Sequence, residues 1–333
     1  MKAGISGIGS ALPGLIVSNE DLARRLDTDD DWIFRRTGIR TRRRLSDGED
    51  VTTLAVAACA DALADAGRAA EDVDAIIIST ITPDFLTPGL APLVAARLGA
   101  VHASAIDVNA ACVGFMHGLD QAAALIESGR AGLVLVCGAE GLSRITDHTD
   151  RSTAVLLGDG AGAVAVTAGD YDLGLPPFEL GADGTHAELL YIDQHDRVLK
   201  MRGAEVYRHA VARMVEATEI ALRASDIGVD DIDFFVAHQA NARIIEAAAD
   251  RLGISRDRIS LHVQEVANTS SASIPLALHQ AERAGALHPG DTIAFAAFGA
   301  GFVWGAGVAC WKEELLTATT VRHMRSQEHA RAD

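Results

Sequence analysis

The sequence predicts an α/β protein made of two related halves. Nearly half of its residues, 49%, are hydrophobic, and alanine and glycine are abundant, which suits a well-packed protein of this class. Short apolar runs such as 73–79 and 131–138 alternate with stretches of helical periodicity, which is the pattern of parallel strands covered by helices. The stretches 71–78 and 229–236 also resemble each other, since both place an Asp-rich turn before a buried strand.

The individual elements follow from apolar spacing and capping residues. The sequence that starts at Ser18 favours the beginning of a short helix, and residues 29–36 carry acids first and arginines last, as a helix dipole prefers. The other expected strands are 2–9, 73–79, 105–108, 131–138, 161–168, 232–238, 293–298 and 305–311, and the other expected helices are 51–66, 113–127, 204–224, 242–252 and 274–284, with one more that ends at Leu98. We expect the strand at 105–108 to be buried.

A division of the chain near residue 170 is expected. A second internal resemblance, between 159–164 and 298–303, favours a duplicated unit with halves at 1–170 and 171–316. The irregular stretch 169–200 is expected to connect the halves and to carry loops over a site. The tail at 317–333 is polar and aperiodic, so we expect it to be disordered.

Charge and composition exclude several classes of function. A net charge of −17 argues against nucleic acid as a partner, and no apolar run is long enough to span a membrane. Four cysteines without metal-ligand spacing, and an N-terminus without a signal peptide, indicate a cytoplasmic protein with free thiols and no metal site. Six arginines nevertheless lie in 35–44, downstream of Arg24 and Arg25, and form either a solvated surface or a docking site for phosphate or an acidic protein.

Cys112 lies where the strand at 105–108 passes into the helix at 113–127. Backbone N–H groups and the positive end of a helix dipole would point at its sulfur, which favours the thiolate. The alternative is a buried structural cysteine. A nucleophilic role therefore depends on partners elsewhere in the chain.

Three other stretches could complete a site around Cys112. His238 follows a strand, Asn268 lies in a loop of small polar residues, and the turn at 298–305 is rich in glycine. Each also has a purely structural interpretation, as a hydrogen-bonding histidine, a turn or a close-packed glycine. Together they suggest a thiolate that attacks an acyl thioester, N–H groups that hold the oxyanion, and two uncharged donors that stabilise an enolate formed by decarboxylation. The three motifs offer no obvious acid for proton abstraction.

Six ordered motifs give the chain a specific resemblance over roughly residues 1–313. They are Trp32–Arg40, Asp107–Phe115, Asp150–Thr153 with Gly158–Ala163, Ala237–Asn241, Ala267–Ser273 and Phe298–Phe302. In these stretches the chain resembles β-ketoacyl-acyl carrier protein synthase III, a condensing enzyme. The resemblance implies a thiolase-like fold, in which two duplicated α/β halves form a five-layered αβαβα core.

The resemblance assigns catalytic roles. Cys112 would be the acylated nucleophile, and His238 and Asn268 would promote decarboxylation of malonyl-acyl carrier protein and stabilise the enolate. The backbone N–H groups of Cys112 and Ala300 would form the oxyanion hole. No cofactor is implied, because the coenzyme A thioester is a substrate.

The resemblance also implies binding surfaces. Trp32 and Arg151 would sandwich the adenine of coenzyme A. The other implied positions are Thr28, Arg36 and Thr37 near the nucleotide, Gly203, Tyr207 and Asn241 along the pantetheine tunnel, Thr87, Leu142, Leu157, Leu189 and Phe298 in the acyl pocket, and Arg208 and Arg243 at the docking site of the acidic carrier protein. Relatives form homodimers in which the 82–89 loop crosses into the acyl pocket of the partner.

Three departures from the family pattern point to a starter-unit or secondary-metabolism variant, for instance in polyketide biosynthesis, as readily as to the initiator of fatty acid biosynthesis. Ala267 replaces a common glycine and must either avoid a positive φ or tolerate strain. Thr87 replaces the bulky phenylalanine of relatives restricted to acetyl primers, so primers longer than butyryl are expected to fit. The segment 196–201, in the loop region over the tunnel, is shortened.

Other activities are compatible with the same motifs. Some relatives pass the acyl group from the cysteine to an alcohol or amine, although Asn268 favours condensation because simple acyl transfer has no enolate to stabilise. A non-catalytic subunit that binds a partner is a further alternative, and the presence of Cys112 and His238 argues against it. A thiolase would need a second cysteine nearer the glycine turn than Cys310, and a hydroxymethylglutaryl-coenzyme A synthase would need an acid.

Overall fold

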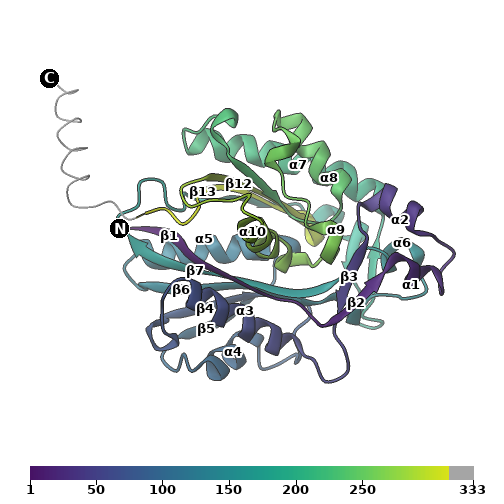
Figure 1. The fold of residues 1–333 in the computed structure, drawn as a ribbon, viewed down its shortest axis with the longest axis horizontal. Coiled ribbons are helices and arrows are strands. Elements are labelled where there is room, and N and C mark those ends of the chain that lie inside the picture. Colours follow the sequence, from purple (N-terminus) through teal and green to yellow (C-terminus); the bar gives the residue numbers. More distant parts are fainter. Residues whose placement is uncertain (315–333) are drawn as a thin grey trace.

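Two β-sheets with helices on both sides form the framework of the chain (Figure 1). The computed structural model describes residues 1–314, so the expected tail at 317–333 lies outside the described residues. The first sheet has five strands in the order β1 (Lys2–Ala11), β7 (Asp159–Gly169), β6 (Leu133–Gly141), β4 (Ala75–Ser79) and β5 (Ser104–Val108). Strand β4 runs parallel to β5 and β6, whereas β7 is antiparallel to β6 and to β1.

The second sheet has the order β11 (Phe234–Ala237), β12 (Thr292–Gly299), β13 (Val303–Cys310) and β8 (Glu179–Ala182). Strand β11 is parallel to β12, and the other two pairings are antiparallel. The division expected near residue 170 falls between the strands of the first sheet and those of the second.

Helices fill three further layers. Helices α3 (Val51–Asp65) and α4 (Leu90–Leu98) cover the outer face of the first sheet, and α7 (Gly203–Ala224) and α8 (Ala242–Leu252) cover the outer face of the second (Figure 1). Helices α5 (Gly114–Glu127) and α10 (Ser273–Arg283) lie between the sheets, where Phe115 and Ile274 join one buried core with strand residues such as Val136 and Phe295. The expected five-layered αβαβα fold is confirmed.

The remaining elements of the described residues are shorter. They are β2 (Leu15–Ser18), β3 (Thr41–Arg44), β9 (Leu190–Ile192), β10 (Leu199–Met201), α1 (Asn19–Ala23), α2 (Asp30–Thr37), α6 (Arg151–Ala154) and α9 (Val263–Val266), with short 3₁₀ helices η1 (Ala70–Asp72), η2 (Ala111–Val113), η3 (Leu142–Ile145), η4 (Gly184–Leu189), η5 (Val229–Asp231), η6 (Arg256–Arg258), η7 (Ser270–Ala272) and η8 (Ala300–Phe302). No helix within residues 1–314 has the length and apolar character required to cross a bilayer.

The local signals act as their chemistry predicts. Ser18 and Asp21 form a capping box at the start of α1, and Asp29 caps α2 by accepting the N–H of Trp32 at 2.7 Å. The resemblance between 71–78 and 229–236 is confirmed, because η1 leads into β4 as η5 leads into β11. Asp72 and Asp231 each accept the N–H three residues before them.

Two expectations about strands are wrong. The strand at 105–108 is not buried, since β5 is an edge strand and Ile106 is 54% exposed. The resemblance between 159–164 and 298–303 does not relate equivalent positions, because the first stretch lies inside β7 and the second spans the end of β12, η8 and the start of β13. In the β6–β7 hairpin Gly160 faces Glu140, and in the β12–β13 hairpin Gly305 faces Ala297. The Gly-Ala-Gly runs at 160–162 and 305–307 are therefore the better match between the halves.

Candidate active site

Cys112 lies in η2, between the end of β5 and the start of α5, as the sequence predicts. The turn that presents it is tight, since Ala111 has a φ of 46° and a Cβ on Gly114 would lie 1.8 Å from the Ser79 Oγ. This close approach fixes the first turn of α5 against the end of β4. The cysteine is therefore held at a junction of the first sheet and a central helix.

The sulfur of Cys112 is a thiol in this structure. Burial, and next the charge of Glu140, raise the pKa of Cys112 to about 12, against the lowering effect of Ser270 and of its own backbone N–H. The backbone N–H at this position lowers the pKa of Cys112, as expected, but desolvation of the sulfur has the larger effect.

His238 follows β11, and its ring is fixed from the second sheet. The backbone N–H of His238 donates to the Ala296 carbonyl at 2.8 Å, and the ring Nδ1 lies 2.7 Å from the Ser273 Oγ. The Ser273 Oγ accepts the backbone N–H of Gln239. Among the described residues, the His238 Nδ1 is the only acceptor for the proton of the Ser273 hydroxyl. The ring proton is then on Nε2, so the nitrogen left for a ligand is a donor. Burial lowers the pKa of His238 to about 3, which keeps the ring neutral.

Asn268 is held by the segment 156–158 of the other half. Its N–H donates to the Leu156 carbonyl and its carbonyl accepts the N–H of Gly158, both at 2.9 Å. Its side-chain Oδ1 accepts the N–H of Ser270 at 2.8 Å. The amide NH₂ of Asn268 is therefore the group left to donate to a ligand.

Backbone strain is concentrated around these residues. Ala267 has φ 59° and ψ −159°, a conformation that favours glycine, so it tolerates strain rather than avoids a positive φ. Ala111, Ser270 and Phe302 also have positive φ values. These four are among the seven non-glycine residues with a positive φ in the part of the chain that the structure describes.

The glycine-rich turn after β12 contacts the nucleophile directly. A Cβ on Gly299 would lie 2.9 Å from the Cys112 N, so only glycine lets the turn approach this closely. Ala300 follows at the start of η8 and lines the same cavity as Cys112. The turn thus has the placement expected of an oxyanion hole.

One cavity of about 620 Å³ joins these groups. Cys112, His238 and Asn268 all line it, together with Ala300 and Trp32. A buried thiol and two neutral donors therefore face one ligand-sized, largely apolar space, which is the arrangement of an acyl-transfer site.

Comparison with known proteins identifies the family. A family model described as 3-oxoacyl-[acyl-carrier-protein (ACP)] synthase III matches residues 106–184, and a model of its C terminal region matches residues 222–311. The β-ketoacyl-[acyl-carrier-protein] synthase III of Geobacillus kaustophilus is 45% identical over 311 residues, which are 93% of this chain and 99% of that protein. The chain belongs to the β-ketoacyl-acyl carrier protein synthase III family.

Solved structures agree. The 3-oxoacyl-[acyl-carrier-protein] synthase III of Aquifex aeolicus has a TM-score of 0.91 at 40% identity and covers 93% of this chain and 100% of its own. The priming β-ketosynthase of a polyketide biosynthetic pathway has a TM-score of 0.90 at 37% identity, with 93% and 96% covered. The thiolase fold and the assignment as an enzyme of the synthase III family follow.

Most of the predicted coenzyme A residues of this synthase lie together. Seven of the eight line the cavity, namely Trp32, Arg36, Thr37, Arg151, Gly203, Tyr207 and Asn241, whereas Thr28 does not. The Trp32–Arg151 pair is closed, since the Arg151 guanidinium carbon lies 4.6 Å from the centre of the indole ring. A base between them would need about 3.5 Å on each face, so Arg151 would have to withdraw for the predicted sandwich to form. The Asn241 side chain caps α8 and donates to the Arg36 carbonyl at 3.0 Å.

The predicted acyl-pocket residues separate into two groups. Leu142, Leu157 and Phe298 line the cavity. Leu189 is buried beside it but does not line it, and Thr87 is exposed on the 82–89 loop, outside the cavity of its own chain. The shortened segment 196–201 lies over the cavity as expected, where it forms part of the β9–β10 hairpin.

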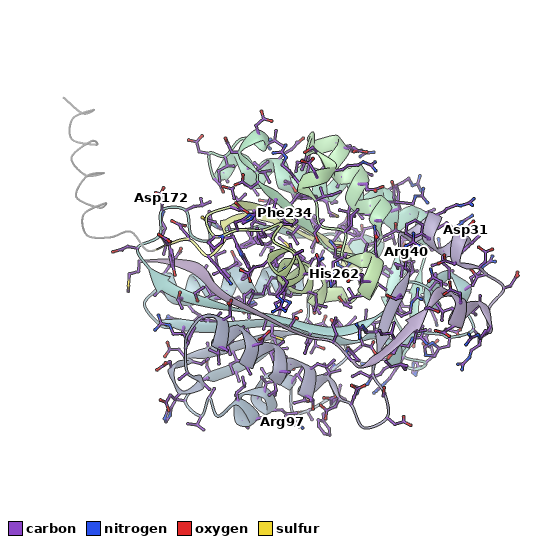
Figure 2. The ribbon with its side chains drawn as sticks, viewed as in Figure 1. Asp31, Arg40, Arg97, Asp172, Phe234 and His262 are labelled. Atoms are coloured by element: carbon purple, nitrogen blue, oxygen red, sulfur yellow. The ribbon has the colours of Figure 1, made fainter. Side chains whose placement is uncertain are left out.

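The arginines of the N-terminal region have several different environments. Arg24 pairs with Asp21, and Arg35 pairs with Asp31, so these two interact within their own helices. Arg40, labelled in Figure 2, stacks on the Phe34 ring of α2 at 3.8 Å and lies 3.9 Å from the Asp30 carboxylate. Among the predicted docking residues, Arg208 is exposed on α7, and Arg243 lines the cavity with its guanidinium 5.7 Å from the Tyr207 ring.

The sequence analysis missed three polar residues of the site. Ser273 orients the His238 ring, and Ser270 lines the cavity. Glu140 is buried behind the turns that carry Cys112 and Asn268. Ser270 and Ser273 belong to a motif that was recognised, but no role was given to them. The signal for Glu140 was a single acid at the end of the apolar run of β6, and only the fold shows that this end of β6 lies against the Asn268 turn.

Proposed function

We propose that this synthase transfers an acyl group from an acyl-coenzyme A to Cys112 and condenses it with malonyl-acyl carrier protein to give a β-ketoacyl-acyl carrier protein. The observation that carries the proposal is the shared cavity of Cys112, His238 and Asn268, in which both partners of the cysteine are neutral donors. Donors suit an enolate, whereas abstraction of a proton would require a base.

The first half of the reaction is acyl transfer. The Cys112 sulfur attacks the thioester carbonyl, and the backbone N–H groups of Cys112 and Ala300 hold the oxygen of the tetrahedral intermediate. Collapse of the intermediate breaks the bond to coenzyme A. The proton of the Cys112 thiol leaves with coenzyme A as its free thiol, so the acyl-enzyme and coenzyme A are both neutral at sulfur.

The second half is decarboxylative condensation. The Nε2–H of His238 and the NH₂ of Asn268 donate to the thioester oxygen of the malonyl group while carbon dioxide departs and its bonding electrons form an enolate. The enolate carbon attacks the acyl carbonyl on Cys112, and the thiolate that leaves takes up a proton. The low pKa of His238 fits this role, because the ring is required as a neutral donor.

Binding of both substrates uses the mouth of the cavity. Trp32 holds adenine once Arg151 withdraws, with Thr28, Arg36 and Thr37 around the nucleotide, and Gly203, Tyr207 and Asn241 contact pantetheine. The exposed Arg208, with Arg243, receives the acidic carrier protein.

A second copy of the chain completes the acyl pocket. Among residues 1–314, strand β5 is an unpaired edge of the first sheet, and Ile106 on it is 54% exposed, while Phe85 and Leu86 of the adjacent loop are 55% and 90% exposed. Pairing of these surfaces in a homodimer buries them and lets Thr87 reach the partner's pocket. The small Thr87 then leaves room for primers longer than butyryl.

The reaction is placed in the cytoplasm. The four cysteines, all within residues 1–314, are unpaired, and Cys112 acts as a free thiol.

Intact-protein mass spectrometry tests the proposal. The full chain, exposed to acyl-coenzyme A and then to malonyl-acyl carrier protein, is expected to gain one acyl group at Cys112 and then release carbon dioxide. The C112S variant controls for acylation elsewhere. Acylation without release of carbon dioxide, and with transfer of the acyl group to an added alcohol or amine, would identify an acyltransferase instead.

A further inference from the structure

A carboxyl group lies buried directly behind the candidate active site. Glu140, near the end of β6, is fully buried at 0% exposure. Its hydrogen-bond partners within residues 1–314 are hydroxyl and backbone N–H groups, with no cation among them. A buried carboxyl group without a cation is costly, so its place beside the site calls for a function.

The two oxygens of Glu140 join turns from the two halves of the chain. Its Oε2 accepts the Thr82 hydroxyl at 2.6 Å and the Ile81 N–H at 3.1 Å, which fixes the turn after β4. Its Oε1 accepts the Ser271 hydroxyl at 2.9 Å, three residues after Asn268. Glu140 therefore holds the Asn268 turn against the end of β4, the strand on which the Cys112 turn also packs.

Ser270 occupies the space between the carboxyl group and the nucleophile. Its hydroxyl is buried and has no hydrogen-bond partner with good geometry in the described chain, and its φ of 49° is held by the bond from its N–H to Asn268. Against the larger effect of burial, the Ser270 hydroxyl lowers the pKa of both the Cys112 thiol and the Glu140 carboxyl. A buried hydroxyl without a partner, on a strained residue at the wall of the cavity, is placed to interact with the sulfur.

Few charges act on Cys112. His238, from the end of β11, is neutral, and Asn268 is uncharged. Glu140, from β6, is the group whose charge raises the pKa of the thiol, and Cys137 on the same strand is another buried thiol beside it. Burial raises the pKa of Glu140 itself to about 7.

We propose that Glu140 and Ser270 set the reactivity of Cys112 from opposite directions. Glu140 is a positioning residue that holds the Asn268 turn and opposes the thiolate by its negative charge, and Ser270 favours the thiolate by donating to the sulfur. This inference rests on the proposed function, in which Cys112 is the nucleophile.

Alkylation of Cys112 by iodoacetamide tests the inference without any substrate. The rate at Cys112 is followed in the full chain by peptide mass spectrometry from about pH 6 to pH 10, below the raised pKa of this thiol, where the rate reports its small thiolate fraction. E140Q keeps the side-chain shape and removes the charge, so its profile is expected to move to lower pH, with alkylation at pH 8 faster by roughly threefold or more. S270A is expected to move the profile to higher pH and to slow alkylation by a similar factor.

Asp159 supplies the matched control. It is also fully buried and bonded to a serine and to backbone N–H groups, but it does not line the cavity. D159N is expected to leave the Cys112 profile in place. If E140Q does not fold, T82V removes the shortest hydrogen bond to the carboxylate and is expected to move the profile in the E140Q direction by a smaller amount.

Two outcomes would overturn the inference. One is a profile that stays in place in both E140Q and S270A, and the other is a shift of the two variants in the same direction. If either result is found and the wild type still condenses normally, the inference is removed and the proposed function remains. If E140Q and S270A shift in opposite directions but the wild type cannot be acylated by an acyl-coenzyme A, the inference is supported and the proposed function is removed.

Discussion

The reacting residues are held in their neutral forms. Burial lowers the pKa of His238 to about 3 and raises that of Cys112 to about 12. Each shift disfavours charge in a cavity that must bind acyl chains. Catalysis then depends on donors aimed at charge that develops during the reaction.

Replacement of the strained Ala267 tests the cost of this arrangement. Its φ of 59° and ψ of −159° suit glycine, and such strain costs about 1–3 kcal/mol, more than the roughly 0.5–1 kcal/mol of entropy that glycine loses on folding. A267G is therefore expected to raise the free energy of unfolding by about 1 kcal/mol in urea denaturation. A272G, at a buried alanine with a φ of −74°, is the control and is expected to destabilise. Equal destabilisation by both substitutions would show that Ala267 is not strained.

Glu140 also makes stability depend on pH. Its pKa in the folded chain is about 7, above the value of about 4.3 in an unfolded chain, so the folded state binds this proton more tightly. The stabilisation of the folded state by this proton is complete below the unfolded-state pKa of Glu140 and is lost as the pH rises through about 7. The free energy of unfolding of the wild type, relative to E140Q, is expected to fall from pH 5 to pH 8 in denaturation curves. A constant difference would mean that Glu140 does not titrate in this range.

At the scale of elements, the β9–β10 hairpin controls the width of the cavity. Ile192 and Leu199 line the cavity and pack on Leu142 and Leu157. L199F is expected to slow acylation of Cys112 by long acyl-coenzyme A primers at least about tenfold and to spare acetyl-coenzyme A, because the added volume shortens the pocket. V198F, next to it but not in the cavity wall, is the control. A primer range from acetyl to dodecanoyl that is the same in all three proteins would contradict this role of the hairpin.

The sequence predicts elements well where period and caps agree, as at Ser18, Asp29 and the helix at 242–252. It fails for β5, because an apolar strand reads the same whether its own chain or a second copy covers it. It does not predict the desolvation of Cys112 or the place of Glu140, because both depend on the packing of distant segments, such as β6 against the Asn268 turn. Cys112, His238 and Asn268 were predictable because each lies at an element end with a distinctive local motif.

At the scale of the whole molecule, the open edge of the first sheet predicts association. I106E places a charge on β5 and is expected to convert a dimer into a monomer in size-exclusion chromatography with light scattering. The monomer is also expected to lose discrimination between primers, since the 82–89 loop no longer completes the pocket. I16E is a matched control, because Ile16 is similarly exposed, at 52%, on β2. A dimer that persists in I106E would place the interface elsewhere.

The cavity is lined by residues from both halves of the chain, so the two steps of the reaction can be assigned to different residues. Cys112 belongs to the first sheet and its helix, whereas His238 and Asn268 come from the second half. Loss of the His238 or the Asn268 side chain is then expected to stop condensation without stopping acylation.

Release of carbon dioxide by the isolated acyl-enzyme is the most direct test of the central claim. The wild type, acylated at Cys112 and mixed with malonyl-acyl carrier protein, is expected to release about one carbon dioxide per acyl group as its acyl mass disappears. H238A and N268A are expected to acylate normally and then release carbon dioxide at least about a hundredfold more slowly, with the acyl group still on Cys112. Release at the wild-type rate in these variants, or β-ketoacyl product from C112S, would contradict the account.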